Sequence, residues 1–226
     1  AGNYTGGIHL QASHDNVFEG NRIGTDRTGS VAIENGHGLT MDSSSSANRI
    51  GGPTPAQANV ISGNYNAGIS IGGTLNLIEG NVIGLDATGS LALGNNRGVW
   101  ITGDDNVIRN NVLSGNRYVG VDFFDGAQGN LLHGNLIGTN AAGTGALGNL
   151  SGIAMQQANI ANNTIAGNTI SGNKHHGISL ARAHHNRFVG NLIGTDLTGS
   201  YAISNGTAPE SGHGFICSDN SHDNRI

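Results

Sequence analysis

The chain has 226 residues, of which 39 are glycine and 30 are asparagine, while charged residues make up 11% and aromatic residues 4%. An average domain has about 7% glycine and about 25% charged residues, so an ordinary globular composition is excluded. The formal net charge of −5 argues against nucleic acid as a partner. No apolar run approaches the roughly 20 residues of a membrane helix, and the single cysteine, Cys217, excludes a disulfide framework.

An internal repeat runs along the whole chain. The segment EGNRIGTDRTGSVAI at 19–33 returns as EGNVIGLDATGSLAL at 79–93, as HGNLIGTNAAGTGAL at 133–147 and as VGNLIGTDLTGSYAI at 189–203. Each interval also contains a shorter unit, so the true repeat is about half as long as the spacing of these copies. Such self-similarity is typical of a solenoid, in which each repeat is one structural unit stacked on the next.

Each unit opens with glycine, an apolar residue, any residue and another apolar residue, and two Asn-x-apolar triplets follow it. The opening glycines are Gly7, Gly38, Gly68, Gly98, Gly120, Gly152, Gly177 and Gly214. Short alternating apolar runs between glycine and asparagine indicate strands. The pattern predicts one continuous all-β solenoid over 1–226, without a second domain, with seven to eight coils of three short strands. The triplet asparagines should stack as ladders at the corners, and Cys217, at an inward site, should be buried.

These motifs resemble the right-handed parallel β-helix repeat of the pectin-lyase-like superfamily. They are still more similar to the Asn- and Gly-rich repeats of large bacterial secreted and surface proteins. The resemblance covers the whole chain and implies a right-handed parallel β-helix at an extracellular or cell-surface location. Because GNYTGGI at the start matches GNYNAGI at 63–69 inside a coil, we expect a segment of a longer protein. Unpaired strand edges at its ends would favour self-association, end to end or side by side.

Insertions interrupt the repeat at regular intervals. Every other coil carries the same eight-residue loop before the next opening glycine, the last loop is longer (195–213), and coil two has its insertion at 51–58. The loops should form a ridge along one edge of the first sheet. Four equivalent residues in them are Asp26, Asp86, Asn140 and Asp196. Because calcium needs six to eight oxygens, one side chain per loop is better explained as a turn former, so no cofactor is expected and calcium is the less favoured alternative.

The outer face of the first sheet holds the candidate site. Residues two and four positions after each opening glycine should face outward, and these rows place Trp100, the only tryptophan, beside Asp122 on the next coil. The row four positions after each glycine adds Phe124 and Gln156. The chain entering this face adds Arg97, Arg117, Tyr118, Lys174 and His176, and the chain leaving it on the far side adds Asp104, Asp105 and Asp125.

An aromatic ring flanked by carboxylates and cations suits a sugar chain, because rings stack on pyranoses while polar groups orient hydroxyls. We therefore expect a polysaccharide partner, with binding residues Trp100, Arg117, Tyr118, Phe124, Asp125, Gln156 and Lys174. Catalysis is a second interpretation: Asp122 would pair with Asp104, Asp105 or Asp125 in hydrolysis, or Arg97, Arg117, Lys174 or His176 would abstract a proton in a lyase reaction. A passive stalk segment with an ordinary solvated surface is the third.

Two histidine pairs, His175-His176 and His184-His185, raise the question of a metal site. Adjacent residues in a strand point to opposite faces. We therefore expect each pair to diverge and no metal ion to be shared.

Overall fold

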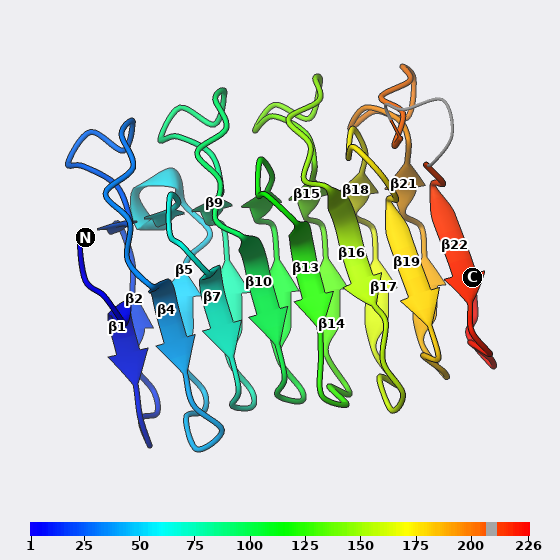
Figure 1. The fold of residues 1–226 in the computed structure, drawn as a ribbon, viewed down its shortest axis with the longest axis horizontal. Helices are drawn as coiled ribbons and strands as arrows, with labels where there is room; N and C mark the ends of the chain where they lie inside the picture. The colour runs from blue at the N-terminus through cyan, green and yellow to red at the C-terminus, as the bar shows by residue number, and fades with distance from the viewer. Residues whose placement is uncertain (207–211) are drawn as a thin grey trace.

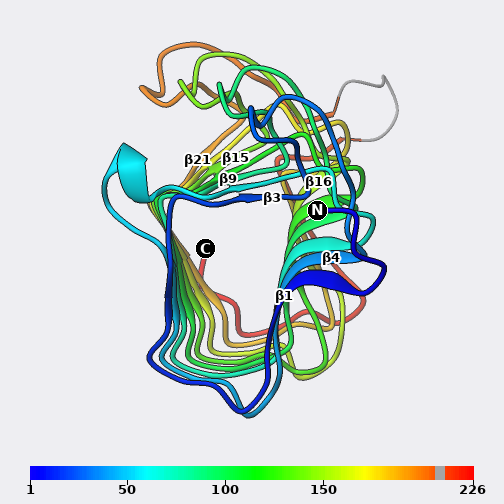
Figure 2. The ribbon, with the colours of Figure 1, turned by 90° about the vertical axis from the view of Figure 1, so that its left-hand side faces the viewer.

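The computed structural model describes residues 1–206 and 212–226 and is almost entirely β-structure. Its strands form three parallel sheets of eight, seven and seven strands, which run side by side along one long axis (Figure 1). Seen along that axis, the coils superimpose and the sheets enclose a common interior (Figure 2). The predicted parallel solenoid is therefore confirmed.

The chain visits the three sheets in turn, so consecutive strands of one sheet are three elements apart. Sheet one contains β1 (Gly6–Leu10), β4 (His37–Met41), β7 (Ala67–Ile71), β10 (Arg97–Ile101), β13 (Val119–Phe123), β16 (Ser151–Met155), β19 (Ile178–Ala181) and β22 (Phe215–Ser218). Sheet two contains β2 (Val17–Phe18), β5 (Arg49–Gly51), β8 (Leu77–Glu79), β11 (Val107–Arg109), β14 (Leu131–His133), β17 (Thr164–Ala166) and β20 (Arg187–Val189). Sheet three contains β3 (Arg22–Ile23), β6 (Val60–Ile61), β9 (Val82–Ile83), β12 (Val112–Leu113), β15 (Leu136–Ile137), β18 (Thr169–Ile170) and β21 (Leu192–Ile193).

Equivalent residues of neighbouring coils are directly opposite one another. In sheet one, for example, Val99 pairs with Ile69 on one side and with Val121 on the other. We number the coils one to eight after their strands in sheet one. The insertion predicted at 51–58 is present in coil two as a short 3₁₀ turn, η1 (Pro55–Gln57). Among the described residues, no helix is both long and apolar enough to cross a membrane.

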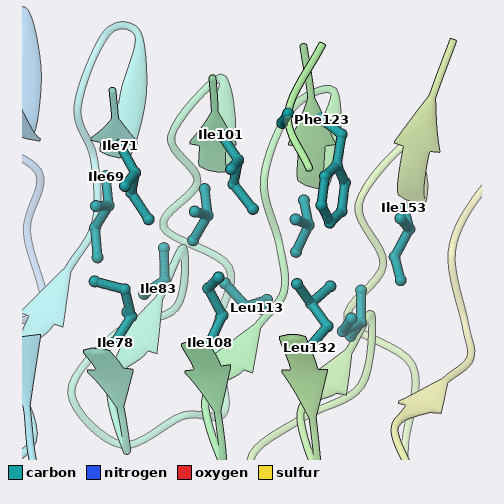
Figure 3. Close-up of a cluster of buried hydrophobic side chains, with 14 of the residues drawn as sticks. Ile69, Ile71, Ile78, Ile83, Ile101, Ile108, Leu113, Phe123, Leu132 and Ile153 are labelled. Carbon is teal, nitrogen blue, oxygen red and sulfur yellow. The ribbon is translucent and has the colours of Figure 1, made fainter. Parts of the chain in front are cut away.

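Stacked aliphatic side chains fill the interior (Figure 3). Ile71 and Ile101 stand in line with Phe123, and Ile78 and Ile108 form a second row; all are at most 1% exposed. Each such side chain contributes about 2 kcal/mol of gross burial energy. The strict period of apolar residues in the sequence follows from this stacking, because a slip of one residue would turn the row out of the core.

Asparagine ladders tie the coils together at the corners, as predicted. In the ladder before sheet two, Asn106 donates from its backbone N (2.9 Å) and its Nδ2 (3.1 Å) to Oδ1 of Asn130. Its Nδ2 also donates to the carbonyl of Gly73 on the previous coil (2.9 Å). One side chain thus joins three coils. The predicted ladders are Asn16, Asn48, Asn76, Asn106, Asn130, Asn163, Asn186 and Asn224, and Asn21, Asn59, Asn81, Asn111, Asn135, Asn168 and Asn191.

A third ladder, which we did not predict, lies before sheet one. It consists of Asn3, Asn35, Asn64, Asn95, Asn116, Asn149, Asn173 and Asn205. Its signal in the sequence is an asparagine three or four residues before the opening glycine in coils one to seven.

This ladder explains two glycines of the repeat. Gly84 has a φ of +96°, and a Cβ there would lie 2.4 Å from Oδ1 of Asn116. A Cβ on the opening Gly98 would lie 3.0 Å from Nδ2 of the same asparagine and 2.4 Å from the carbonyl of Gly120. Asn116 therefore fits only because both positions lack a side chain.

The large loops form the predicted ridge at the edge between sheets three and one (Figure 1). In each loop one side chain organises the turn: Oδ1 of Asp86 accepts from the backbone N of Ser90 (3.0 Å) and Leu91 (2.9 Å). Successive loops also bond to each other through Ala87 N to Gly29 O, Ala141 N to Gly89 O and Leu197 N to Gly143 O. The turn-forming role is confirmed, although residues 207–211 of the last loop lie outside the described residues.

Cys217 corrects one expectation. It pairs with Leu180 in register, as an inward residue should, yet it is exposed rather than buried. The reason is its place on β22, the edge strand of sheet one, where it has a neighbouring strand on one side only.

Candidate functional site

The outward row two residues after each opening glycine is in register throughout sheet one. It reads His9, Thr40, Ser70, Trp100, Asp122, Ala154, Ser179 and Ile216. A large aromatic ring and a carboxylate therefore occupy adjacent coils in the middle of a row of mostly small side chains. Gln156 follows β16 on the next coil, so Trp100, Asp122 and Gln156 lie on successive coils as expected.

Four side chains from coils four and five form what we call the outer-face cluster: Arg97, Trp100, Asp122 and Phe124. Nε of Arg97 donates to Oδ2 of Asp122 at 2.8 Å, and the Asp122 side chain is only 16% exposed. The Arg97 guanidinium lies 5.4 Å from the centre of the Trp100 ring, within cation–π range. Phe124 meets Trp100 edge to face, with centroids 5.8 Å apart.

The electrostatics of Asp122 are unusual for a carboxylate in an ion pair. Burial raises its pKa above the ordinary value, and the hydrogen bond and charge of Arg97 only partly oppose that effect. Desolvation therefore outweighs the favourable partner. The charged form of Asp122 is therefore disfavoured by burial, and carboxyl groups with shifted pKa values are often found at functional sites.

Two polar atoms at this face are buried without a hydrogen-bond partner among the described residues: Nε1 of Trp100 and Nδ1 of His37. Most buried polar atoms in native proteins are paired, so such orphans suggest a group that completes them. His37 also has a lowered pKa, because of burial and then of the Arg97 charge. We did not predict a role for His37. The sequence does indicate its position, because His37 directly precedes an opening glycine, as Arg97 does in coil four.

The remaining predicted binding residues surround the cluster at different distances along the sheet. Gln156 donates from Nε2 to Oγ of Ser179 on coil seven (2.8 Å). Arg117, Tyr118 and Lys174 are exposed in the turns at the ridge edge. On the same edge, Tyr4 and Tyr65 line a hollow of about 590 Å³ beside coils one to three, away from the cluster.

The predicted acidic partners of Asp122 lie in turns that follow the strands of sheet one. Asp104 and Asp105 lie in the corner turn between sheets one and two, where Oδ1 of Asp104 accepts from the backbone N of Gln128 (2.8 Å). Asp105 has a left-handed backbone with a φ of +56°, and Asp125 is exposed in the turn after β13. Among the described contacts, Asp122 meets Arg97 and none of these carboxylates, so the pair needed for hydrolysis stays a prediction.

His176 lies two coils beyond Asp122, in a separate group with His175 and His213. The His176 ring centroid is 3.8 Å from that of His175 and 5.5 Å from that of His213. Its Nδ1 accepts from the backbone N of His213 (3.2 Å). Burial, together with the charges of the two neighbouring imidazoles, lowers the pKa of His176.

The expectation that the histidine pairs diverge is wrong. Neither pair lies within a strand, and His185 has a φ of +56°. This left-handed residue turns the chain, so Nδ1 of His184 and Nδ1 of His185 approach to 2.8 Å. On coil eight, His222 stacks on His184 and bonds to Asp223. Within the described residues, no three metal-ligating side chains already surround one point.

Comparisons with known proteins agree with this architecture. A solved structure, the periplasmic alginate epimerase AlgG as a T265N mutant, matches with a TM-score of 0.55 and 17% identity over 85% of this chain and 48% of that one. The chain thus spans about half the length of that protein, and the likeness establishes the right-handed parallel β-helix fold. No curated protein sequence matches significantly. The family model of NosD, described as a periplasmic copper-binding protein, matches residues 1–146 and 143–226, and the chain therefore belongs to the NosD family.

Proposed function

We propose that the outer face of sheet one binds polysaccharide, with Trp100 as the stacking ring and the Arg97–Asp122 pair orienting polar groups of the sugar. The observation that carries the proposal is the Asp122 carboxyl, whose pKa is raised by burial, on the coil next to the half-buried Trp100, whose buried Nε1 has no hydrogen-bond partner among the described residues. Aromatic rings with a few polar groups are the usual lining of sugar sites.

The binding surface would follow the long axis. Tyr65 and Tyr118 are both more than half exposed and lie in the turns that enter coils three and five, three and two residues before the opening glycines. An extended glycan along this edge would pass both turns. Arg97, Arg117 and Lys174 would pair with carboxylates, which favours a glycan that contains uronic acids.

The relatives support a site of action outside the cytoplasm. The NosD family and the AlgG structure are both described as periplasmic, and AlgG is named for alginate, a polyuronate. We infer that this chain also works beyond the inner membrane and meets glycans there. We also infer that the chain forms part of a larger surface protein, because its repeat resembles those of such proteins.

Binding without turnover is favoured over hydrolysis. A pair of carboxylates about 5–9.5 Å apart is the usual requirement for glycoside hydrolysis. Of the predicted partners of Asp122, Asp104 accepts a hydrogen bond from the backbone N of Gln128. The raised pKa of Asp122 keeps it as a candidate for proton transfer.

The family description also names copper. Imidazole nitrogen is a good ligand for Cu(II), and two imidazole Nδ1 atoms of this chain, in His184 and His185, lie 2.8 Å apart. Within the described residues, however, no three His, Cys, Asp or Glu side chains surround one point, so these two histidines do not form a copper site as they stand.

The test of the polysaccharide proposal measures retention on polyuronate and on neutral glycans, together with assays for reducing ends and unsaturated products. Trp100→Ala should weaken retention of the preferred glycan at least about tenfold, the scale of a lost aromatic anchor. Trp100→Phe should retain much of it, and Tyr201→Ala, which removes a 75% exposed ring on the loop ridge, should change little.

Three outcomes decide the proposal. Retention lost only with Trp100→Ala supports it. Retention that is equal in all variants, or absent in the unchanged protein, contradicts it and favours the passive stalk. Product release that disappears in Asp122→Asn would establish catalysis instead of binding alone.

A further inference from the structure

The turns that enter sheet one leave a hollow on coils one to three. Tyr4 and Tyr65 have the same place in coils one and three, because each directly follows a ladder asparagine and stands three residues before an opening glycine. In coil two the residue that follows the ladder asparagine, Asn35, is Gly36. The two tyrosines therefore line a hollow of about 590 Å³, and the residue between them along the row has no side chain.

The backbone around this hollow is fixed by contacts between the three turns. The backbone N of Gly36 donates to the carbonyl of Asn3 on coil one (2.9 Å), and the backbone N of Tyr65 donates to the carbonyl of Asn35 on coil two (2.9 Å). A Cβ on Gly36 would lie 2.3 Å from the carbonyl O of Tyr4. The close approach of the first two turns thus requires glycine, and the hollow is formed by packed backbone rather than by a loose loop.

The charge of the hollow is negative. Among the described residues that line it, Glu34 is the one charged side chain, and it is exposed. Within that part of the chain, Glu34 also has no ion-pair partner. The faces of tyrosine rings attract cations, and the carboxylate does so as well. The lining therefore favours a ligand with a positive charge.

We infer that this hollow, which we call the tyrosine hollow, binds an organic ammonium group such as the free amine of an amino sugar; the inference does not rest on polysaccharide binding by the outer-face cluster. Equivalent positions two coils apart are separated by about 9.6 Å, at about 4.8 Å per coil. A cation midway between rings at that separation would lie about 5 Å from each, within the roughly 6 Å of a cation–π contact. The volume is also in the usual range of ligand sites, about 300–1,000 Å³.

The same row of turns changes character farther along the molecule. In coils five and seven the residues that directly follow the ladder asparagines are Arg117 and Lys174, in place of Tyr4 and Tyr65. One edge of sheet one thus carries aromatic rings beside a carboxylate at one end and cations at the other. The two ends should select opposite charges, so a uronic acid should not enter the tyrosine hollow.

The experiment titrates the full chain, labelled with nitrogen-15, with D-glucosamine at slightly acidic pH, at which the amine is protonated. The amide signals of Gly36 and Asn66, both at the hollow, should shift saturably. N-acetylglucosamine, which has the same ring and no charge, should bind at least about tenfold more weakly, and glucuronate should leave these signals in place. Choline tests the source of the ammonium group: equal binding would show that the charge alone is recognised, and weaker binding that the sugar ring contributes.

Tyr4→Ala and Tyr65→Ala should each weaken glucosamine binding about two- to fivefold, the scale of one exposed cation–π contact, and the double variant should abolish saturation. Glu34→Gln keeps the shape of the side chain, removes its charge and should weaken binding about three- to tenfold. Tyr201→Ala is the matched control, because it removes a 75% exposed ring on the loop ridge and should change nothing. Trp100→Ala should also leave glucosamine binding unchanged.

Two results would overturn the inference. One is N-acetylglucosamine binding as tightly as glucosamine, or neither sugar shifting the two amide signals. The other is glucosamine binding that Glu34→Gln and the tyrosine double variant leave unchanged while far-ultraviolet circular dichroism shows an intact β-helix. Both results concern the tyrosine hollow alone, because the polysaccharide proposal is decided separately by retention in the Trp100 variants.

Discussion

The inner and outer faces of sheet one differ in how regularly their residues repeat from coil to coil. Inside, the same kinds of residue recur in every coil: aliphatic rows such as Ile69, Val99 and Val121, fully buried, with asparagine ladders at the corners. Outside, the row through Trp100 and Asp122 changes character from coil to coil. Positions that repeat hold the coils together, because each must match the coil above and below.

Positions that break the repeat need another reason. Asp122 has a raised pKa because it is buried, and it destabilises the fold in its charged form. A residue that is neither repeated nor stabilising is the kind that function retains.

Removal of a central ladder asparagine should have the largest effect on stability. Asn106→Ala deprives the backbone N of Asn76 of its acceptor and the carbonyl of Gly73 of its donor, both in the buried interior. At about 1–3 kcal/mol for each unpaired buried group, the loss should be about 3–5 kcal/mol, measured by urea unfolding. Asn224→Ala, at the last coil of the same ladder, should lose clearly less; equal losses would contradict the ladder model.

The loop ridge should show a smaller effect that depends on pH. Burial tends to raise the pKa of Asp86, but the hydrogen bonds from Thr88 and from the backbone of Leu91 and Ser90 outweigh it, so its pKa is lowered. A lowered folded pKa means stability that is present above the unfolded value of 3.8 and is lost as pH falls through the folded one.

Asp86→Ala should therefore destabilise the protein at neutral pH by about 1 kcal/mol and lose that difference in acid. Asp86→Asn should be nearly neutral, since Asn140 forms the same turn in the next loop, where its Oδ1 accepts from the backbone N of Thr144 at 3.0 Å. Thermal unfolding at several pH values would measure both, and an Asn variant as weak as the Ala variant would argue against the turn role.

The contribution of the outer-face cluster to stability should depend on pH in the opposite direction. Because the folded pKa of Asp122 is raised, the native state takes up a proton more readily than the unfolded chain, and the cost of the charged form grows as pH rises through the folded pKa. Asp122→Asn should leave stability unchanged or raise it slightly at neutral pH, within about 1 kcal/mol. The difference should vanish below pH 3.8, where both forms are neutral; a clear destabilisation at neutral pH would make Asp122 a structural residue.

Most of the architecture could be predicted from the sequence, because a solenoid converts spacing along the chain into contacts between coils. The apolar rows, two ladders, the loop ridge and the succession Trp100, Asp122, Gln156 all followed from the period. The third ladder was missed because Asn64 and Asn95 precede their glycines by four and three residues, so their spacing alternates.

The side-chain chemistry was harder to predict. The side chains of His184 and His185 approach each other because His185 has a left-handed backbone. The expectation that adjacent side chains point to opposite faces applies only to residues in a strand. Asp104 and Asp105 lie in the corner turn, where Asp104 accepts a hydrogen bond from the backbone N of Gln128, a role that the sequence pattern did not indicate. The place of His37 directly before an opening glycine is visible in the sequence, but the burial of its Nδ1 without a partner among the described residues is not.

The polysaccharide site can be tested at a single atom pair, because the chain has one tryptophan and therefore one indole resonance in a nitrogen-15 correlation spectrum. Titration with polyuronate oligosaccharides should shift that Trp100 Nε1–H signal saturably, at the concentrations at which the protein binds the glycan. If the glycan binds and the indole signal stays in place, sugar recognition lies elsewhere on the β-helix and the outer-face cluster has no part in it.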